Sequence, residues 1–293
     1  MTTLPRFRFN QSMIKIATAG FSFKSWVGPV YPQGLTPAQY LPYYYRTLGF
    51  DTVEIDASYY AYLGEKTVHA WLEKTDENFS FVVKLHKDLT LNESREYPLK
   101  AVGRAAAERF AASVLPLKEN RRLTALLAQF GPLFARKPEH EKYLADLREC
   151  LPEFPLLVEF RHPSWLKPEQ REATFDFLRR NNLGYVAADL PANLRLPELT
   201  PQVVGEIACL RLHGRNPNWF KADRDERYNY NYRDEELRSF IPLIKEMEKK
   251  ALVTLVTFNN CHGGNALVNA LKLKKFLGLL GPVLLKREEL PGL

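Results

Sequence analysis

The chain alternates short runs of apolar residues with longer segments in which apolar residues recur at helical spacing. The short runs are nearly continuous in apolar side chains, as expected of strands that are covered on both faces. Eight such runs are present, at residues 14–20, 51–56, 79–86, 123–131, 155–162, 183–190, 206–214 and 252–260. The pattern therefore predicts eight β-strands.

Segments of helical period separate the predicted strands. Several begin with a Thr or Pro near the first turn or end at a Gly, which are common boundary signals. The predicted helices lie at residues 36–49, 65–75, 100–115, 137–150, 167–182, 233–250 and 263–278. Pro242 should kink or delay the helix at 233–250, and the Pro-rich stretch PANLRLPELTPQ after the sixth strand is not predicted to be helical.

A strand followed by a helix, repeated about eight times over roughly 250 residues, is the pattern of a (β/α)8 TIM barrel. The alternative is a doubly wound open sheet, which normally carries a Gly-rich phosphate loop after its first strand. Neither GxGxxG nor GxxxxGK[ST] occurs in the chain. We therefore expect an α/β protein with one TIM-barrel domain over residues 1–293 and a barrel core at about 14–280.

Composition places this chain among soluble globular proteins, with 45% hydrophobic and 26% charged residues. No apolar run reaches the length that spans a bilayer, and we expect no signal peptide and no membrane partner. Three scattered cysteines without a CxxC pair favour a reducing compartment, so we expect the protein in the cytoplasm. The net charge of +7 favours an acidic partner, either a small anion or a nucleic-acid backbone.

Polar residues gather at the ends of the predicted strands, whereas the first halves of the same strands are almost wholly apolar. Active sites of TIM barrels form at the C-terminal ends of the strands, so this asymmetry predicts a pocket at one mouth of the barrel. The candidate catalytic residues are Glu54, Glu159, His213 and Asp189. The candidate substrate-binding residues are Lys84, Arg161, Arg211, Arg215, Asn259, Asn260, Tyr60 and Trp26. The alternative is that charges of both signs simply pair in the barrel mouth.

The leading hypothesis is an enzyme that uses acid–base chemistry on a small phosphorylated or carboxylated substrate. Lysine and arginine side chains would bind the anion, Glu159 or Glu54 would act as the base, and His213 would act as its acid partner. Asn259 and Asn260, at the end of the eighth predicted strand, would donate hydrogen bonds to a developing oxyanion. The reaction class (hydrolase, lyase or isomerase) and any cofactor stay open, and two carboxylates also fit a glycosidase.

Two other hypotheses stay open. A metal-dependent hydrolase or isomerase would use Glu54, Glu159, Asp189 and His213 as ligands, although no close-spaced ligand motif such as HExxH occurs in the chain. A non-catalytic nucleic-acid-binding protein would stack bases on YNYNY, Trp26, Trp165 and Trp219. Such aromatic residues more often serve as packing or pocket walls, which favours a small ligand.

Several blocks of the sequence resemble the YecE-like family, also called domain of unknown function 72. The blocks are VEFRHPSW (158–165), AGFSFKSWVGPVYP (19–32), FDTVEIDASYY (50–60), ENFSFVVKLHKDLT (77–90), AADLP (187–191), LRLHGRN (210–216), YNYNY (228–232) and FNNCHGGNALVNA (258–270). Together they cover nearly the whole chain. The resemblance implies a TIM barrel and does not itself supply a reaction.

The chain departs from the family pattern in two places. Leu91 stands where members typically have a His after the Thr that ends the third block in chain order. Phe21-Ser22-Phe23 stands where many members have Trp-Ser-Tyr. The first departure weakens any mechanism that needs an acid or base at that position.

Overall fold

The computed structural model describes residues 13–90, 101–192, 194–223 and 226–280. Eight parallel strands form its centre, and each lies within one of the eight apolar runs or overlaps it closely. The strands are β1 (Met13–Thr18), β2 (Thr52–Ile55), β3 (Ser80–Lys84), β4 (Leu123–Gln129), β5 (Leu156–Glu159), β6 (Gly184–Asp189), β7 (Ile207–Leu212) and β8 (Val253–Phe258). All eight strand predictions are therefore confirmed.

The strands pair in the order β1-β8-β7-β6-β5-β4-β3-β2, and every pair is parallel. A single parallel bridge between Ala19 and Glu54 joins the two ends of this series. The sheet is thus a nearly closed ring, and the predicted (β/α)8 barrel is confirmed. The parallel ring brings the C-terminal ends of all eight strands to one mouth.

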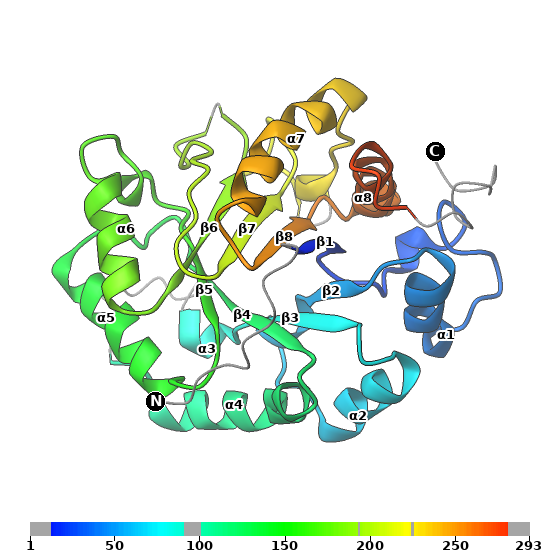
Figure 1. The fold of residues 1–293 in the computed structure, drawn as a ribbon, viewed down its shortest axis with the longest axis horizontal. Helices are drawn as coiled ribbons and strands as arrows, with labels where there is room; N and C mark the ends of the chain where they lie inside the picture. Colours follow the sequence, from blue (N-terminus) through cyan, green and yellow to red (C-terminus); the bar gives the residue numbers. More distant parts are fainter. Residues whose placement is uncertain (1–12, 91–100, 193, 224–225, 281–293) are drawn as a thin grey trace.

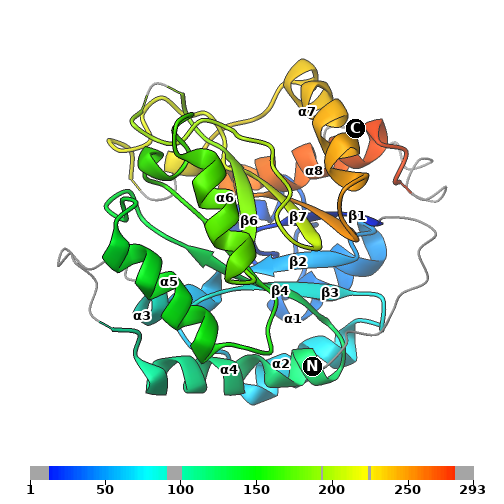
Figure 2. The same ribbon diagram turned by 60° about the vertical axis from the view of Figure 1, so that its left-hand side comes forward.

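Helices surround the ring on its outer side (Figures 1 and 2). They are α1 (Pro37–Pro42), α2 (Glu65–Lys74), α3 (Lys87–Thr90), α4 (Arg104–Glu119), α5 (Pro138–Cys150), α6 (Arg171–Arg180), α7 (Asp234–Glu248) and α8 (Asn265–Phe276). The helix predicted at 36–49 is divided, because α1 passes into a π-helical turn at Tyr43–Thr47. Helix α7 begins at Asp234 and continues through Pro242, so this proline does not delay it.

The barrel interior consists of an apolar layer beneath a polar one. The apolar layer contains Ala17, Val82, Ala125, Leu127, Leu157, Val186, Cys209 and Leu255. Side chains alternate along a strand, so residues two positions further on face the same interior. On five strands these next residues are polar: Lys84, Gln129, Glu159, Arg211 and Thr257. The apolar layer closes the barrel from below and presents the polar layer to the mouth.

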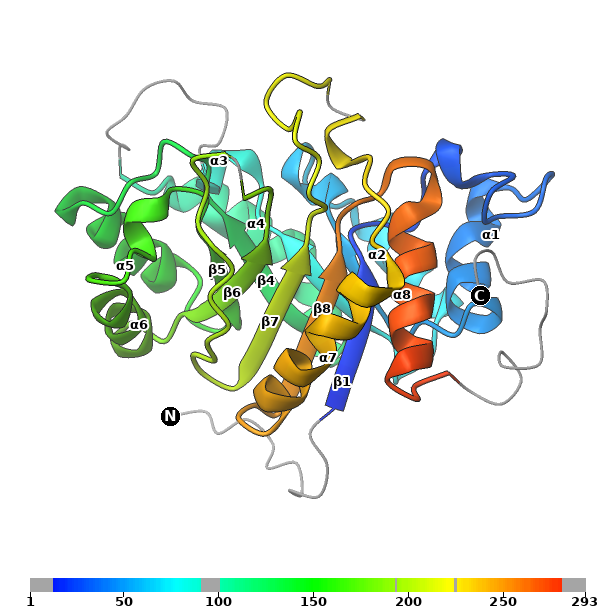
Figure 3. The same cartoon turned by 90° about the horizontal axis from the view of Figure 1, so that it is seen from above.

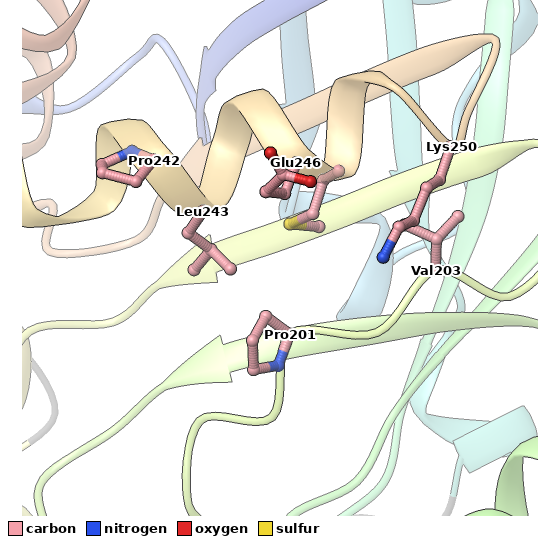
Figure 4. Close-up of a pocket in the computed structure, with 7 residues that line it drawn as sticks. Pro201, Val203, Pro242, Leu243, Glu246 and Lys250 are labelled. Carbon is pink, nitrogen blue, oxygen red and sulfur yellow. The ribbon is translucent and has the colours of Figure 1, made fainter.

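No helix lies between β6 and β7 within the described residues, as the Pro-rich sequence there suggested. A groove of about 300 Å³ lies between this connection and α7 (Figure 4). It is lined by Pro201, Val203, Pro242, Leu243, Glu246, Met247 and Lys250. These residues belong to the outer layer of the barrel and are separate from the polar layer at the mouth. Within the described residues, no helix is both long and apolar enough to cross a membrane.

Candidate functional site

Arg211 is the centre of the polar layer. Its side chain is fully buried, and Nε and Nη2 donate to the two carboxylate oxygens of Glu54 at 3.0 and 2.6 Å. Its Nη1 forms an ion pair with Glu159 and donates to Gln129 Oε1 at 3.1 Å. One guanidinium thereby joins strands β2, β4, β5 and β7, and its planar shape suits such bidentate contacts.

Glu159 also connects Arg211 to the residues above it. Arg161 Nε donates to Glu159 Oε1 at 2.5 Å, and Arg161 Nη2 lies 3.1 Å from His213 Nε2. His213 Nε2 is 3.3 Å from Glu159 Oε2, and Asn259 Nδ2 donates to His213 Nδ1 at 2.9 Å. A ring with its proton on Nε2 satisfies the contacts with Glu159 and Asn259, because Nε2 then donates to Glu159 and Nδ1 accepts from Asn259.

We call Glu54, Gln129, Glu159, Arg161, Arg211, His213 and Asn259 the central cluster. Burial and attraction act differently on its titratable groups. Burial raises the pKa of Glu54, although Arg211 opposes this shift. Burial would also raise the pKa of Glu159, but attraction to Arg161 and Arg211 outweighs it and holds this pKa well below its usual value. Burial and Arg161 lower the pKa of His213 to about 3. At neutral pH the cluster therefore contains an ionised Glu159 beside a neutral His213.

Lys84 forms a second ion pair at the same mouth. Its Nζ donates to Asp56 Oδ1 at 2.7 Å and lies 4.9 Å from the centre of the Tyr59 ring. Burial alone would lower the pKa of Lys84, but Asp56 and, to a smaller extent, Tyr228 raise it. The side chain of Asp56 is 29% exposed, so this pair is nearer to solvent than the fully buried Arg211.

The segment between β7 and α7 rises above the strand ends (Figure 3) and covers the central cluster. The ring of Trp219, in this segment, lies 5.7 Å from the Arg161 guanidinium and 6.2 Å from the His213 ring. Gly214 has a φ of +84°, and a Cβ there would lie 2.6 Å from the Cβ of Tyr230. Only glycine fits this turn, which directs the chain away from His213 and over the mouth.

Asp189 and Arg215 lie on the other side of the sheet from the central cluster. Arg215 Nη2 donates to Asp189 Oδ1 at 2.8 Å, and Tyr232 OH donates to Asp189 Oδ2 at 2.6 Å. Arg215 also pairs with Glu236 of α7 at 3.2 Å. We call these four residues the outer clamp. The backbone N–H of His213 donates to the Asp189 carbonyl at 3.1 Å, so the clamp fixes the start of the covering segment.

The structure also does not bring Asn260 and Trp26 into the central cluster. Asn260 Nδ2 donates to the Tyr230 carbonyl at 2.7 Å and to Asn269 Oδ1 at 2.8 Å. The ring of Trp26 is fully buried, and its Nε1 donates to the Cys261 carbonyl at 2.7 Å. Both side chains therefore hold loops in place. Tyr60 differs, because it is 42% exposed at the mouth.

Three residues outside the predicted catalytic and substrate-binding sets contribute to the mouth: Asp56, Gln129 and Trp219. Asp56 and Gln129 are polar residues at strand ends, so the strand-end rule points to both, and Trp219 was suggested only as a base-stacking residue. Trp219 lies in a loop without periodicity, and no local signal places it over Arg161. Leu91 lies outside the described residues.

The arrangement bears on the two alternative hypotheses. Among the described residues, no three His, Cys, Asp or Glu side chains are grouped so that they could hold a metal ion. The Arg211 guanidinium lies between Glu54 and Glu159, where a metal would have to bind. For nucleic acid, the proposed stacking residues Trp26, Trp165 and Trp219 are all buried, so they do not form an exposed stacking surface. Within the described residues, the geometry therefore supports neither a metal site at these carboxylates nor base stacking on these tryptophans.

The fold and the cluster define a TIM-barrel protein with a paired set of acids, bases and guanidinium groups at its C-terminal mouth. A family model described as "Protein of unknown function DUF72" matches residues 15–291, and the chain belongs to this family. The resemblance to YecE-like proteins is thereby confirmed.

Three relatives illustrate the extent of the similarity. A DUF72 family protein from Thermotoga maritima, of known crystal structure, is 38% identical, with a TM-score of 0.82 over 91% of this chain and 99% of the other. A DUF72 family protein from Enterococcus faecalis is 27% identical, with a TM-score of 0.80 over 92% and 97% of the two chains. UPF0759 protein YunF of Bacillus subtilis is 29% identical over 238 residues, which cover 78% of this chain and 84% of YunF.

Proposed function

We propose that this protein is an enzyme that uses acid–base chemistry on a small phosphorylated or carboxylated substrate at the C-terminal mouth of its barrel. The observation that carries the proposal is the buried contact of His213 with Glu159 and Arg161, whose side-chain atoms lie 3.3 and 3.1 Å from His213 Nε2. His213, which the sequence suggested as the acid, would here act as the base: its Nδ1 accepts the substrate proton in place of the Asn259 N–H. Glu159 supplies a negative charge that stabilises the protonated ring, and Arg161 supplies a cation for the substrate.

Arg161 and Lys84 are the groups that bind the anion. Both are largely buried: Lys84 belongs to the polar layer, and Arg161 follows Glu159 of that layer by two positions. Within the described residues, Nη1 of Arg161 has no hydrogen-bond partner, so one edge of its guanidinium is free to donate to a ligand. Charge-assisted hydrogen bonds of this kind are among the strongest that proteins make.

Binding of the anion prepares His213 for proton transfer. Arg161 is, after burial, the main cause of the low pKa of His213. A bound anion partly neutralises Arg161, which raises the pKa of the ring toward the range in which histidine exchanges protons. Glu159 then stabilises the protonated ring across 3.3 Å. Arg211 and Glu54 hold Glu159 in place, and Asp189 acts as a positioning residue through the outer clamp.

Exchange of carbon-bound substrate protons with solvent tests this proposal for a lyase or an isomerase that abstracts a proton from carbon. The protein is incubated in D2O with a mixture of small phosphorylated and carboxylated metabolites, and deuterium incorporation is measured by mass spectrometry. We expect the native protein to exchange at least one compound and His213→Gln to exchange it about 100-fold more slowly, because general base catalysis contributes about that factor.

The matched control is His69→Gln, which replaces an exposed histidine of α2 that pairs with Glu65. This control should exchange the compound at the native rate. Equal rates in the native protein and His213→Gln would contradict the role of His213 as the base, and no deuterium in any compound would contradict a lyase or an isomerase.

A further inference from the structure

The mouth carries aromatic side chains from two loops that lie beside the charged residues. One group follows β2 and comprises Tyr59 and Tyr60, whose ring centres are 4.8 Å apart. The other group comes from the β7–α7 segment, where the rings of Trp219 and Tyr228 are 5.0 Å apart. The proposed function assigns no role to either group.

Both aromatic groups are in contact with the anion-binding cations. The ammonium of Lys84 lies over the Tyr59 ring, and the side chain of Tyr228 contributes to the raised pKa of Lys84. The guanidinium of Arg161 lies over the Trp219 ring. Each of the two cations thus lies beside an aromatic ring at the C-terminal ends of the strands.

Each of these two loops also exposes one aromatic side chain to solvent. Tyr60 is 42% exposed and the neighbour of Trp219, Phe220, is 52% exposed. Within the described residues, the other strongly exposed large hydrophobic side chains are aliphatic. Tyr60 and Phe220 both belong to loops that follow strand ends. Large apolar surfaces beside polar groups commonly mark ligand sites.

From this arrangement we infer that the anionic substrate carries an aromatic ring, which packs between the two loops while its phosphate or carboxylate binds Arg161 and Lys84. This inference rests on the proposed function, because it assigns a substrate class to the same mouth. Aromatic side chains favour ring partners over aliphatic groups of equal size, since ring pairs gain from edge-to-face and offset stacking beyond the area they bury.

Three phosphate esters that differ in one group test the inference: phenyl, cyclohexyl and methyl phosphate. Calorimetric titration of the full chain gives their dissociation constants. We expect phenyl phosphate to bind about tenfold more tightly than methyl phosphate and several-fold more tightly than cyclohexyl phosphate. Tyr60→Leu and Phe220→Leu should each remove most of the phenyl preference and leave methyl phosphate unchanged. Both positions are exposed, so neither substitution should prevent folding.

Two further variants separate the possible outcomes. Leu115→Ala, at an exposed position on α4, should bind all three esters as the native protein does. Arg161→Gln should weaken all three about equally. Equal affinity for phenyl and cyclohexyl phosphate, with binding still dependent on Arg161, would overturn the aromatic substrate and leave the proposed function intact. Failure of all three esters and of benzoate to bind would overturn the anionic substrate itself.

Discussion

Arg211→Met should lower the free energy of unfolding by about 3–5 kcal/mol. Methionine retains much of the apolar stem, but it leaves Glu54 and Glu159 buried without the guanidinium that pairs with both of them. Removal of one partner from a buried ion pair costs this amount because the remaining charge cannot be solvated. Chemical denaturation followed by circular dichroism measures the change.

The control for this substitution is Arg179→Met, which breaks an exposed ion pair with Asp176 on α6. Exposed pairs contribute little, so we expect a change within about 0.5 kcal/mol. Adding Glu54→Gln to Arg211→Met should recover part of the lost stability, since it removes one unpaired charge. A loss below about 1 kcal/mol for Arg211→Met would show that Arg211 does not hold the polar layer together.

Acidification from pH 7 to pH 5 should lower the stability of the native protein by about 2 kcal/mol through His213 alone. In the unfolded chain this histidine takes up a proton near its usual pKa of 6.5, whereas the folded protein resists protonation down to about pH 3. Unfolding therefore takes up a proton below pH 6.5, and each pH unit below that value costs about 1.4 kcal/mol.

The comparison with His213→Gln isolates this contribution. The loss of stability between pH 7 and pH 5 should be smaller by about 2 kcal/mol in the variant than in the native protein. The comparison stops at pH 5 so that Glu159 does not affect it. The pKa of Glu159 is lowered in the fold, so this group changes the stability with pH mainly below its usual pKa of 4.5. Identical pH profiles for the two proteins would mean that His213 titrates normally in the fold.

The fold was predictable because its signal repeats. Each strand of a closed parallel barrel is covered on both faces, and eight continuous apolar runs follow directly from that geometry. Local deviations were harder to predict. The π-helical turn at Tyr43–Thr47 and the uninterrupted α7 around Pro242 depend on tertiary packing, which helix propensity does not include.

The site was predictable only in part. Strand position correctly suggested that Glu54, Glu159 and Arg211 would meet, because alternation places all three in the barrel interior. Asp189 satisfied the strand-end rule, but alternation places it on the outer face, because it lies three positions after the interior Val186. Asn260 lies beyond the end of β8 and binds loop backbone. Its direction is set by loop contacts that sequence spacing does not encode.

The most direct test of the account is the titration of the His213 ring by two-dimensional ¹H–¹⁵N NMR, with His213→Gln used to assign its signals. Without ligand, the ring should stay neutral at every pH above about 4. With saturating phenyl phosphate, its pKa should rise by at least one unit as the anion neutralises Arg161. A ring that titrates near pH 6.5 without ligand, or one whose pKa does not respond to the bound anion, would contradict the role of His213 as the proton carrier of this site.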